Sequence, residues 1–182
     1  MSDSYRVRTA TPADTPALRE LIARSIRTLG AGDYSPDQIE AALKGAFGVD
    51  TALIHDETYF VIVSATGEIA GCGGWSKRRT LFGSDARGGR DDSYLDPQTD
   101  FAKIRAFFID PAHARRGLGR LLLEHCESRA LEAGFAGFEL MATLPGKRLY
   151  ENHGYAPSEP IEHPLPDGLA ITFVPMRKRA RG

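Results

Sequence analysis

Two kinds of feature are scarce or missing in the sequence, and each absence removes a class of protein. The chain has only two cysteines, Cys72 and Cys126, and neither belongs to a Cys-x-x-Cys pair. We therefore expect no metal or redox site, and we expect both thiols to be small core side chains. No segment approaches the ~20 apolar residues of a membrane span, and the first residues carry no apolar signal region. We expect a cytoplasmic protein with no membrane partner.

A surplus of positive charge is also missing. The 182 residues include 23 Lys and Arg against 24 Asp and Glu, which gives a formal net charge of −1. Because nucleic-acid binding depends on a positive surface, we expect no nucleic-acid partner; only the cluster at 77–79 and the basic C-terminus argue for one. With 42% apolar and 26% charged residues, the composition is that of a globular protein. No repeat or linker divides it, so we expect a single domain over residues 1–177 and a short basic tail over 178–182.

The spacing of apolar residues predicts alternating strands and helices. In chain order we expect a strand at 5–10, a helix from Pro12 to near Gly30, a shorter helix after Ser35, hairpin strands at 58–65 and 69–76, a strand at 104–109, a helix from about Gly117 to near Gly134, a strand at 137–143, a short helix at 147–152, and an antiparallel pair at 155–162 and 169–177. Gly71, Gly73 and Gly74 indicate a bulge or a close backbone approach in the second hairpin strand. Residues 77–100 are irregular, and we place this long loop at the substrate side.

The stretch Ile104–Ser128 is the most informative part of the chain. An apolar and aromatic strand leads through a short turn to Gly117 and Gly119, where an apolar helical pattern begins. Glycines at the start of a helix let the backbone approach a ligand and leave the first N–H groups free, and the positive end of the helix dipole favours an anion there. Further positive charge comes from Arg115, Arg116 and Arg120. We interpret this loop as a cradle for a diphosphate.

The glycine loop matches neither of two common nucleotide motifs. Leu122 stands where a dinucleotide-binding fingerprint would have its third glycine, and no Gly-Lys-Ser/Thr follows. Taken alone, the two glycines are equally compatible with a plain turn among solvated arginines. The order of the surrounding elements therefore has to decide.

That order resembles the GNAT superfamily of acyl-CoA N-acyltransferases over nearly the full length. The resemblance is most specific in Phe107–Leu123 and in Arg148–Tyr155, which look like the family's motifs A and B. It implies an α/β (α+β) single domain with a central mixed, largely antiparallel sheet. The sheet would be splayed between its fourth and fifth strands and flanked by about four helices.

The resemblance also implies that acetyl-CoA is held in the splay, as a co-substrate and without a metal. The family's Gln/Arg-x-x-Gly-x-Gly/Ala loop maps onto Ala114–Gly119, where Ala114 replaces the usual Gln or Arg. Backbone groups of the fourth strand would pair with the pantetheine arm like an added strand. Thr143 stands where motif B often has Asn. The implied cofactor-binding residues are Phe107, Phe108, Ile109, Arg115, Arg116, Gly117, Leu118, Gly119, Arg120 and Thr143.

Tyr150 is the residue that we expect to take part in the chemistry. Its place in Leu-Tyr-x-x-x-Gly-Tyr is that of the family's tyrosine that protonates the departing CoA thiolate, and a tyrosine pKa of about 10 is close enough to a thiol pKa of about 8.5 for this role. The alternative is that Tyr150 only packs against the cofactor strand. The general base is not assigned, because Lys103 and Arg105 occupy the part of the fourth strand where many members carry an acid. Glu139, His153 and a water relay all remain candidates.

Cations near the expected cleft suggest an acceptor with a carboxylate. Lys103 or Arg105 would bind that group, and Trp75 and Phe82 would supply an apolar wall. The sequence thus predicts an acetyl-CoA-dependent N-acetyltransferase acting on a primary amine of a small molecule. The alternatives are a protein or peptide amino group as acceptor and a non-catalytic acyl-CoA-binding sensor module. The acceptor, the acyl length and the oligomeric state, including a homodimer, stay open.

Overall fold

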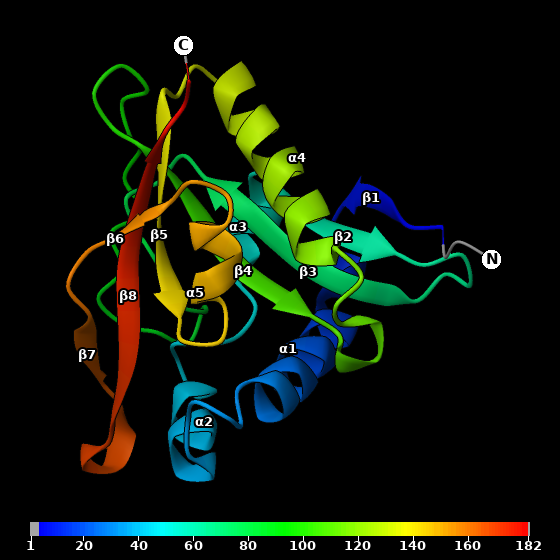
Figure 1. The fold of residues 1–182 in the computed structure, drawn as a ribbon, viewed down its shortest axis with the longest axis vertical. Coiled ribbons are helices and arrows are strands. Elements are labelled where there is room, and N and C mark those ends of the chain that lie inside the picture. Colours follow the sequence, from blue (N-terminus) through cyan, green and yellow to red (C-terminus); the bar gives the residue numbers. More distant parts are fainter. Residues whose placement is uncertain (1–3, 182) are drawn as a thin grey trace.

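A mixed sheet of eight strands forms the centre of the computed structural model (Figure 1). The structure describes residues 4–181, so residues 1–3 of the expected domain and residue 182 of the expected tail lie outside it. In sheet order the strands are β1 (Arg6–Thr9), β2 (Tyr59–Val63), β3 (Ile69–Ser76), β4 (Ala102–Ile109), β5 (Gly137–Thr143), β8 (Ala170–Arg179) and β6 (Ala156–Pro157), and β7 (Ile161–Pro164) also pairs with β8. The mixed, largely antiparallel sheet predicted from the sequence is confirmed.

The helices begin and end close to the capping signals in the sequence. They are α1 (Thr15–Leu29), α2 (Pro36–Ala42), α3 (Thr51–His55), α4 (Leu118–Glu132) and α5 (Lys147–Glu151). A 3-10 turn at Pro12–Asp14 precedes α1, so the expected first helix is divided at its start. Ser35 caps α2, since its Oγ accepts the Gln38 N–H at 3.1 Å while Gln38 Oε1 accepts the Ser35 N–H at 2.8 Å. The short α3 was not predicted.

Two hydrophobic clusters pack on opposite faces of the sheet. Leu18, Leu21 and Ile22 of α1 belong to one cluster, and Leu122 and Cys126 of α4 belong to the other. The strands serve both clusters because side chains alternate between the faces of a strand. In β2, for example, Tyr59, Val61 and Val63 join the α1 cluster while Phe60 and Ile62 join the α4 cluster. Both cysteines are buried free thiols, as predicted.

Strands β4 and β5 are parallel and separate after a short contact. Within the described residues their register comprises only Ala102 with Phe138 and Lys103 with Glu139. Figure 1 shows the two arrows diverging from that point. The splay inferred from the resemblance is therefore present, and from Ile104 onward the edge of β4 that faces β5 is not paired with it.

The β3–β4 pair contains a bulge next to the splay. Cys72 pairs with Phe108 and Gly74 with Arg105, so β4 carries one residue more than β3 in this interval. Ala106 lies there with a φ of 55°, and its carbonyl accepts the Tyr59 hydroxyl at 2.9 Å. A Cβ on Gly73 would lie 2.4 Å from Phe107 Cδ1. The glycine-rich β3 thus marks both the bulge and the close approach that its sequence indicated.

The C-terminal segment corrects one boundary. The basic tail was expected to begin at residue 178, but Lys178 and Arg179 are part of β8 and pair with Phe138 and Gly137. Lys178 Nζ also lies 2.8 Å from Glu127 Oε2 on α4. A lysine in a solvated tail would lack this carboxylate partner, and the sequence gave no sign of it because Glu127 is 51 residues away.

Candidate active site

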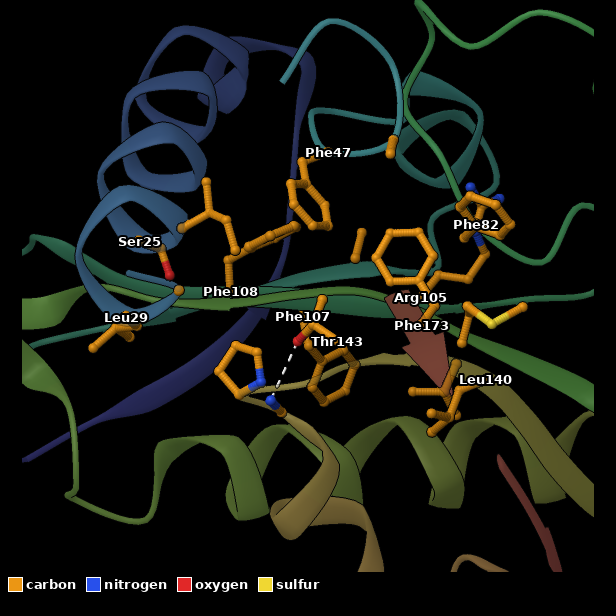
Figure 2. Close-up of a pocket in the computed structure, with 18 of the residues that line it drawn as sticks. Ser25, Leu29, Phe47, Phe82, Arg105, Phe107, Phe108, Leu140, Thr143 and Phe173 are labelled. Atoms are coloured by element: carbon orange, nitrogen blue, oxygen red, sulfur yellow. Dashed lines mark hydrogen bonds between the residues drawn. The ribbon is translucent and has the colours of Figure 1, made fainter. Parts of the chain in front are cut away.

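A cavity of about 260 Å³ occupies the splay between β4 and β5 (Figure 2). Residues 104–109 of β4 line it, and β5 contributes Leu140, Met141 and Thr143. The C-terminal end of α1, the first turn of α4, α5, β8 and loops at 46–48, 82–83 and 145–146 complete the lining with Ser25, Ile26, Leu29, Gly30, Ala46, Phe47, Gly48, Phe82, Gly83, Gly119, Pro145, Gly146, Leu149, Tyr150 and Phe173. The fold therefore brings residues from both halves of the sheet to one largely apolar site.

The three residues expected to bind the pantetheine arm all line this cavity. Phe107 packs against the α4 cluster and Phe108 against the α1 cluster, so the side chains of neighbouring residues serve the two cores. Their backbone lies on the edge of β4 that β5 leaves free. An extended, amide-containing molecule can add to such an edge by main-chain hydrogen bonds.

The loop before α4 has the geometry of an anion site. Gly117, the N-cap of α4, has a φ of 76°, a conformation that glycine adopts without strain. The Leu121 N–H donates to the Gly117 carbonyl at 3.1 Å, so the amides of the preceding residues in the first turn are left free by the helix. Gly119 has a different reason to be glycine, since a Cβ there would lie 2.9 Å from Leu149 Cδ2 on α5.

The arginines around this loop differ in their partners. Arg120 Nε donates to Glu124 Oε1 at 2.7 Å, one turn further along α4. Arg116 donates to the Tyr5 hydroxyl at 3.1 Å, and that hydroxyl also bonds to His113 Nδ1 at 2.9 Å. Arg115 is exposed with a φ of 60°. The loop thus presents positive charge, of which Glu124 neutralises the part on Arg120. Because an exposed ion pair is weak, a more highly charged anion such as a diphosphate could replace Glu124 as the partner of Arg120.

Tyr150 of α5 reaches the cavity and is held by aromatic neighbours. Its side chain is buried, and its ring lies 6.3 Å from Phe107 and 5.8 Å from Tyr155 between centroids. Burial raises the pKa of the Tyr150 hydroxyl above its ordinary value. The hydroxyl therefore stays protonated and able to donate a proton or hydrogen bond throughout the neutral and moderately alkaline range.

Thr143 ends β5 at the turn that leads into α5. Its Oγ1 accepts the Gly146 N–H at 3.2 Å, drawn as the dashed line in Figure 2, and its carbonyl accepts the same N–H at 3.1 Å. The threonine hydroxyl still has its own hydrogen to donate to a ligand. Thr143 lines the cavity, and its implied role in binding the pantetheine arm stays a prediction.

Glu139 and Lys103 are brought together but away from the cavity lining. They form an ion pair across the β4–β5 register, and Arg177 Nη2 lies 2.9 Å from Glu139 Oε2. A carboxylate bound between two cations is a poor proton acceptor. His153 is placed similarly, because its Nδ1 bonds to the Leu149 carbonyl at 2.7 Å and it does not line the cavity. Neither Glu139 nor His153 is therefore in the described lining of the cavity, where a base would have to meet an acceptor amine.

Arg105, by contrast, lines the cavity. Its guanidinium is buried, with Nη2 2.7 Å from Asp50 Oδ2 and 2.7 Å from the Gly83 carbonyl that accepts its N–H. The fully buried Asp50 also binds Arg90, whose Nη2 lies 3.0 Å from Oδ2. Sequence reasoning missed Asp50 as part of the site. Its position before Thr51 is typical of a helix N-cap, but nothing in the sequence connects it with Arg90 or Arg105.

An aromatic wall stands at the Arg105 end of the cavity. The ring centroids of Phe47 and Phe82 lie 5.9 Å and 5.4 Å from that of Phe173, and Figure 2 shows Phe82, Phe173 and Arg105 gathered together. Phe82 was expected in such a wall. Trp75 was also expected there, but it packs against Phe135 in the α4 cluster and does not line the cavity. The reason is the strand order, since β4 stands between β3 and the splay and no residue of β3 is in the described lining.

Comparison with known proteins agrees with this geometry. Residues 20–155 match the model of the Acetyltransferase (GNAT) family. Among solved structures, a GCN5-related N-acetyltransferase from Rhodopseudomonas palustris is similar with a TM-score of 0.71 and 19% identity over 98% of each chain. No curated protein matches the chain.

Two further solved structures of N-acetyltransferases have a similar fold. The PaiA N-acetyltransferase of Thermoplasma acidophilum, solved with coenzyme A, has a TM-score of 0.63 and 15% identity over 97% of this chain and 99% of that one. The ribosomal-protein-S18-alanine N-acetyltransferase of Escherichia coli has a TM-score of 0.59 and 17% identity over 98% of this chain and 96% of that one.

Within residues 4–181 no helix is both long and apolar enough to cross a bilayer.

Proposed function

The chain belongs to the acetyltransferase (GNAT) family, and from this premise we propose that it transfers an acetyl group from acetyl-CoA to a primary amine of a small molecule. The observation that carries the proposal is the cavity in the β4–β5 splay, which joins the free edge of β4, Tyr150 and the apolar end around Phe82 in one space.

The residues present fit acetyl-CoA. The amides of the first turn of α4 and the nearby Arg115 suit a diphosphate, and the edge of β4 suits an extended arm with two amide groups. Thr143 adds a hydroxyl donor beside that edge. When bound, acetyl-CoA supplies an activated thioester carbonyl, which a neutral amine can attack without a nucleophile from the protein.

In the transfer the amine lone pair forms the N–C bond, the C–S bond breaks, and the sulfur leaves with its electron pair. Tyr150 provides the proton or hydrogen bond that this sulfur needs and regains its proton from water. Because burial raises the pKa of Tyr150, its hydroxyl is still protonated at the pH where an alkylamine with a pKa near 10 becomes neutral. A thiolate that forms in the same apolar cavity is also poorly solvated, which increases the benefit of this donor.

The proton lost by the amine has a less direct route. The polar side chains in the described lining are those of Ser25, Arg105, Thr143 and Tyr150, and none of them is a base at neutral pH. We therefore assign the acceptance of that proton to water at the open side of the cavity. This choice replaces Glu139 and His153 among the candidates, because both are engaged by protein partners outside the lining.

The test compares Tyr150→Phe with wild type. Acetyl-CoA affinity is measured by calorimetry and turnover by release of free thiol with a panel of amines, amino acids and peptides. The ring contacts with Phe107 and Tyr155 remain in the variant, so we expect unchanged affinity and a fall in kcat of about 10²–10⁴, the usual contribution of a general acid. Tyr94→Phe is the matched control, since Tyr94 is 62% exposed and outside the lining.

Other results would point elsewhere. Binding of acetyl-CoA with no thiol release from any acceptor would favour a sensor module. Release only with peptides would make a protein amino group the acceptor. Equal kcat for wild type and Tyr150→Phe would remove the tyrosine from the mechanism, and absence of acetyl-CoA binding would contradict the proposal as a whole.

A further inference from the structure

Arg105 is the only charged side chain in the described lining of the cavity. It is 4% exposed, and one of its terminal nitrogens serves both Asp50 and the Gly83 carbonyl. Its Nε–H is buried and has no hydrogen-bond partner among the described residues. Figure 2 shows the side chain reaching toward Phe82 at the apolar end of the cavity. A buried cation therefore has an unused N–H donor beside the part of the cavity where the acceptor amine would bind.

The charges buried around Arg105 do not cancel. Among the described residues, Asp50 is the only fully buried carboxylate, and it is shared by Arg105 and Arg90, whose side chains are 2% and 10% exposed. Asp85 and Asp92 also approach Arg90, but they are 44% and 49% exposed, so solvent screens them. Two buried cations thus face one buried anion, and the excess positive charge adjoins the cavity.

This excess charge selects among acceptors in two ways. A positive charge beside an apolar cavity attracts an anionic group and repels an ammonium group. The lining also contains no carboxylate or imidazole that could remove a proton from an ammonium ion, within the part of the chain that the structure describes. An alkylamine with a pKa near 10 would be neutral in only about one molecule in a thousand at pH 7.

We propose that the acceptor is a small apolar amine that is uncharged near neutral pH and carries one negatively charged group, which binds Arg105. An arylamine carboxylate has this chemistry. Its ring matches the wall of Phe47, Phe82 and Phe173, and its weakly basic nitrogen needs no base before attack. Asp50 acts as a positioning residue that holds the guanidinium at the wall. The inference rests on the acetyl transfer proposed above and specifies its acceptor.

Four amines test the two properties separately. They are 4-aminobenzoate, aniline, 4-(aminomethyl)benzoate and benzylamine, which combine presence or absence of a carboxylate with weak or strong basicity. The assay is thiol release from acetyl-CoA, reported as kcat/KM at pH 7. We expect 4-aminobenzoate to exceed aniline by roughly tenfold to a hundredfold, the effect of one charge-assisted hydrogen bond. We also expect it to exceed 4-(aminomethyl)benzoate, by a margin that narrows as the pH rises toward 10.

Variants then assign the carboxylate preference to Arg105. In Arg105→Met the ratio of kcat/KM for 4-aminobenzoate over aniline should fall to within about threefold of one, and Arg105→Lys should keep part of it. Acetyl-CoA affinity by calorimetry shows that each variant is folded and retains its co-substrate site. Arg177→Met is the matched control and should keep the wild-type ratio, because Arg177 is 67% exposed and outside the lining.

The wild-type panel decides even if a variant does not fold. Equal kcat/KM for 4-aminobenzoate and aniline, or benzylamine as the best acceptor at pH 7, would overturn the inference. Thiol release with other amines but with none of these four would also overturn it and would leave the acetyltransferase proposal standing. If acetyl-CoA binds and no amine of any kind releases thiol, the acetyl-transfer proposal itself fails, and the inference fails with it.

Discussion

The cluster of Asp50, Arg90 and Arg105 predicts unequal effects for the loss of its anion and of one of its cations. Asp50→Asn leaves Arg105 without a carboxylate and Arg90 with only the half-exposed Asp85 and Asp92, whereas Arg105→Met leaves a matched pair of Asp50 and Arg90. Asparagine keeps an oxygen for the Ala52 N–H, which now lies 3.0 Å from Asp50 Oδ1, so the cap of α3 is retained. The substitution therefore isolates the loss of charge.

The magnitudes follow from burial. Breaking a buried ion pair from one side costs about 3–5 kcal/mol, so Asp50→Asn should lower the free energy of unfolding by that amount. Arg105→Met should cost about 1–2 kcal/mol, mainly for the lost hydrogen bond to the Gly83 carbonyl. For a chain of this length ~1 kcal/mol corresponds to ~2–4 °C, which predicts falls in Tm of about 6–20 °C and about 2–8 °C.

Thermal unfolding followed by circular dichroism measures both effects. The double variant Asp50→Asn, Arg105→Met should melt above the Asp50→Asn variant, because it contains one unpaired cation fewer. A Tm for Arg105→Met as low as that for Asp50→Asn would refute the reasoning. So would a double variant whose loss is the sum of the two single losses, since the residues would then be independent.

Two further predictions concern the cradle and the long loop. Gly117→Ala should weaken acetyl-CoA binding in calorimetry, because a φ of 76° strains an L residue at the anion site. Gly67→Ala is the control, since Gly67 has a φ of 88° and equally open space, so this variant should bear the same strain with unchanged acetyl-CoA affinity. Equal losses of acetyl-CoA affinity in the two variants would contradict the cradle. The Arg78 guanidinium, 2.6 Å from Asp56, lowers the pKa of Asp56 below 3.8, so this pair stabilises the fold at neutral pH and the effect is lost as the pH falls below about 4. Asp56→Asn should thus melt below wild type at pH 7 by a margin that shrinks toward pH 3, whereas a constant margin would exclude the ion pair as its cause.

The elements that follow local rules could be predicted from the sequence. The start of α2 was readable because Ser35, Pro36 and Gln38 are a capping signal contained within four residues. Strand β5 was predicted at its observed bounds, Gly137–Thr143, since a mostly apolar run with the single charge of Glu139 stands there between two turns. The helix α3 escaped because five residues are too few for a helical period to be recognised.

The candidate site divides along the same line. Tyr150 and the glycine loop were identified because they belong to contiguous motifs whose order is characteristic of the family. Trp75 was misplaced because β4 separates β3 from the splay. Asp50 was missed because its partners, Arg90 and Arg105, are 40 and 55 residues away in the chain. Which side chains line the cavity and which distant charges pair depend on how the strands are arranged in the sheet. A local sequence pattern does not show this arrangement.

The short β4–β5 pairing divides the sheet into two halves. Within the described residues these halves are paired with each other only at Ala102 with Phe138 and Lys103 with Glu139. Residues 104–109 of β4 and the facing residues of β5 have no hydrogen-bonded partner in each other, so a molecule laid across the gap becomes a structural strut between the halves. A molecule bonded to both strands suppresses local opening of β4 and of β5 together. Amide hydrogen exchange should therefore slow in both strands when that molecule is bound. For the acetyl-CoA proposed above, we therefore expect binding to join the two halves of the sheet and release to separate them again.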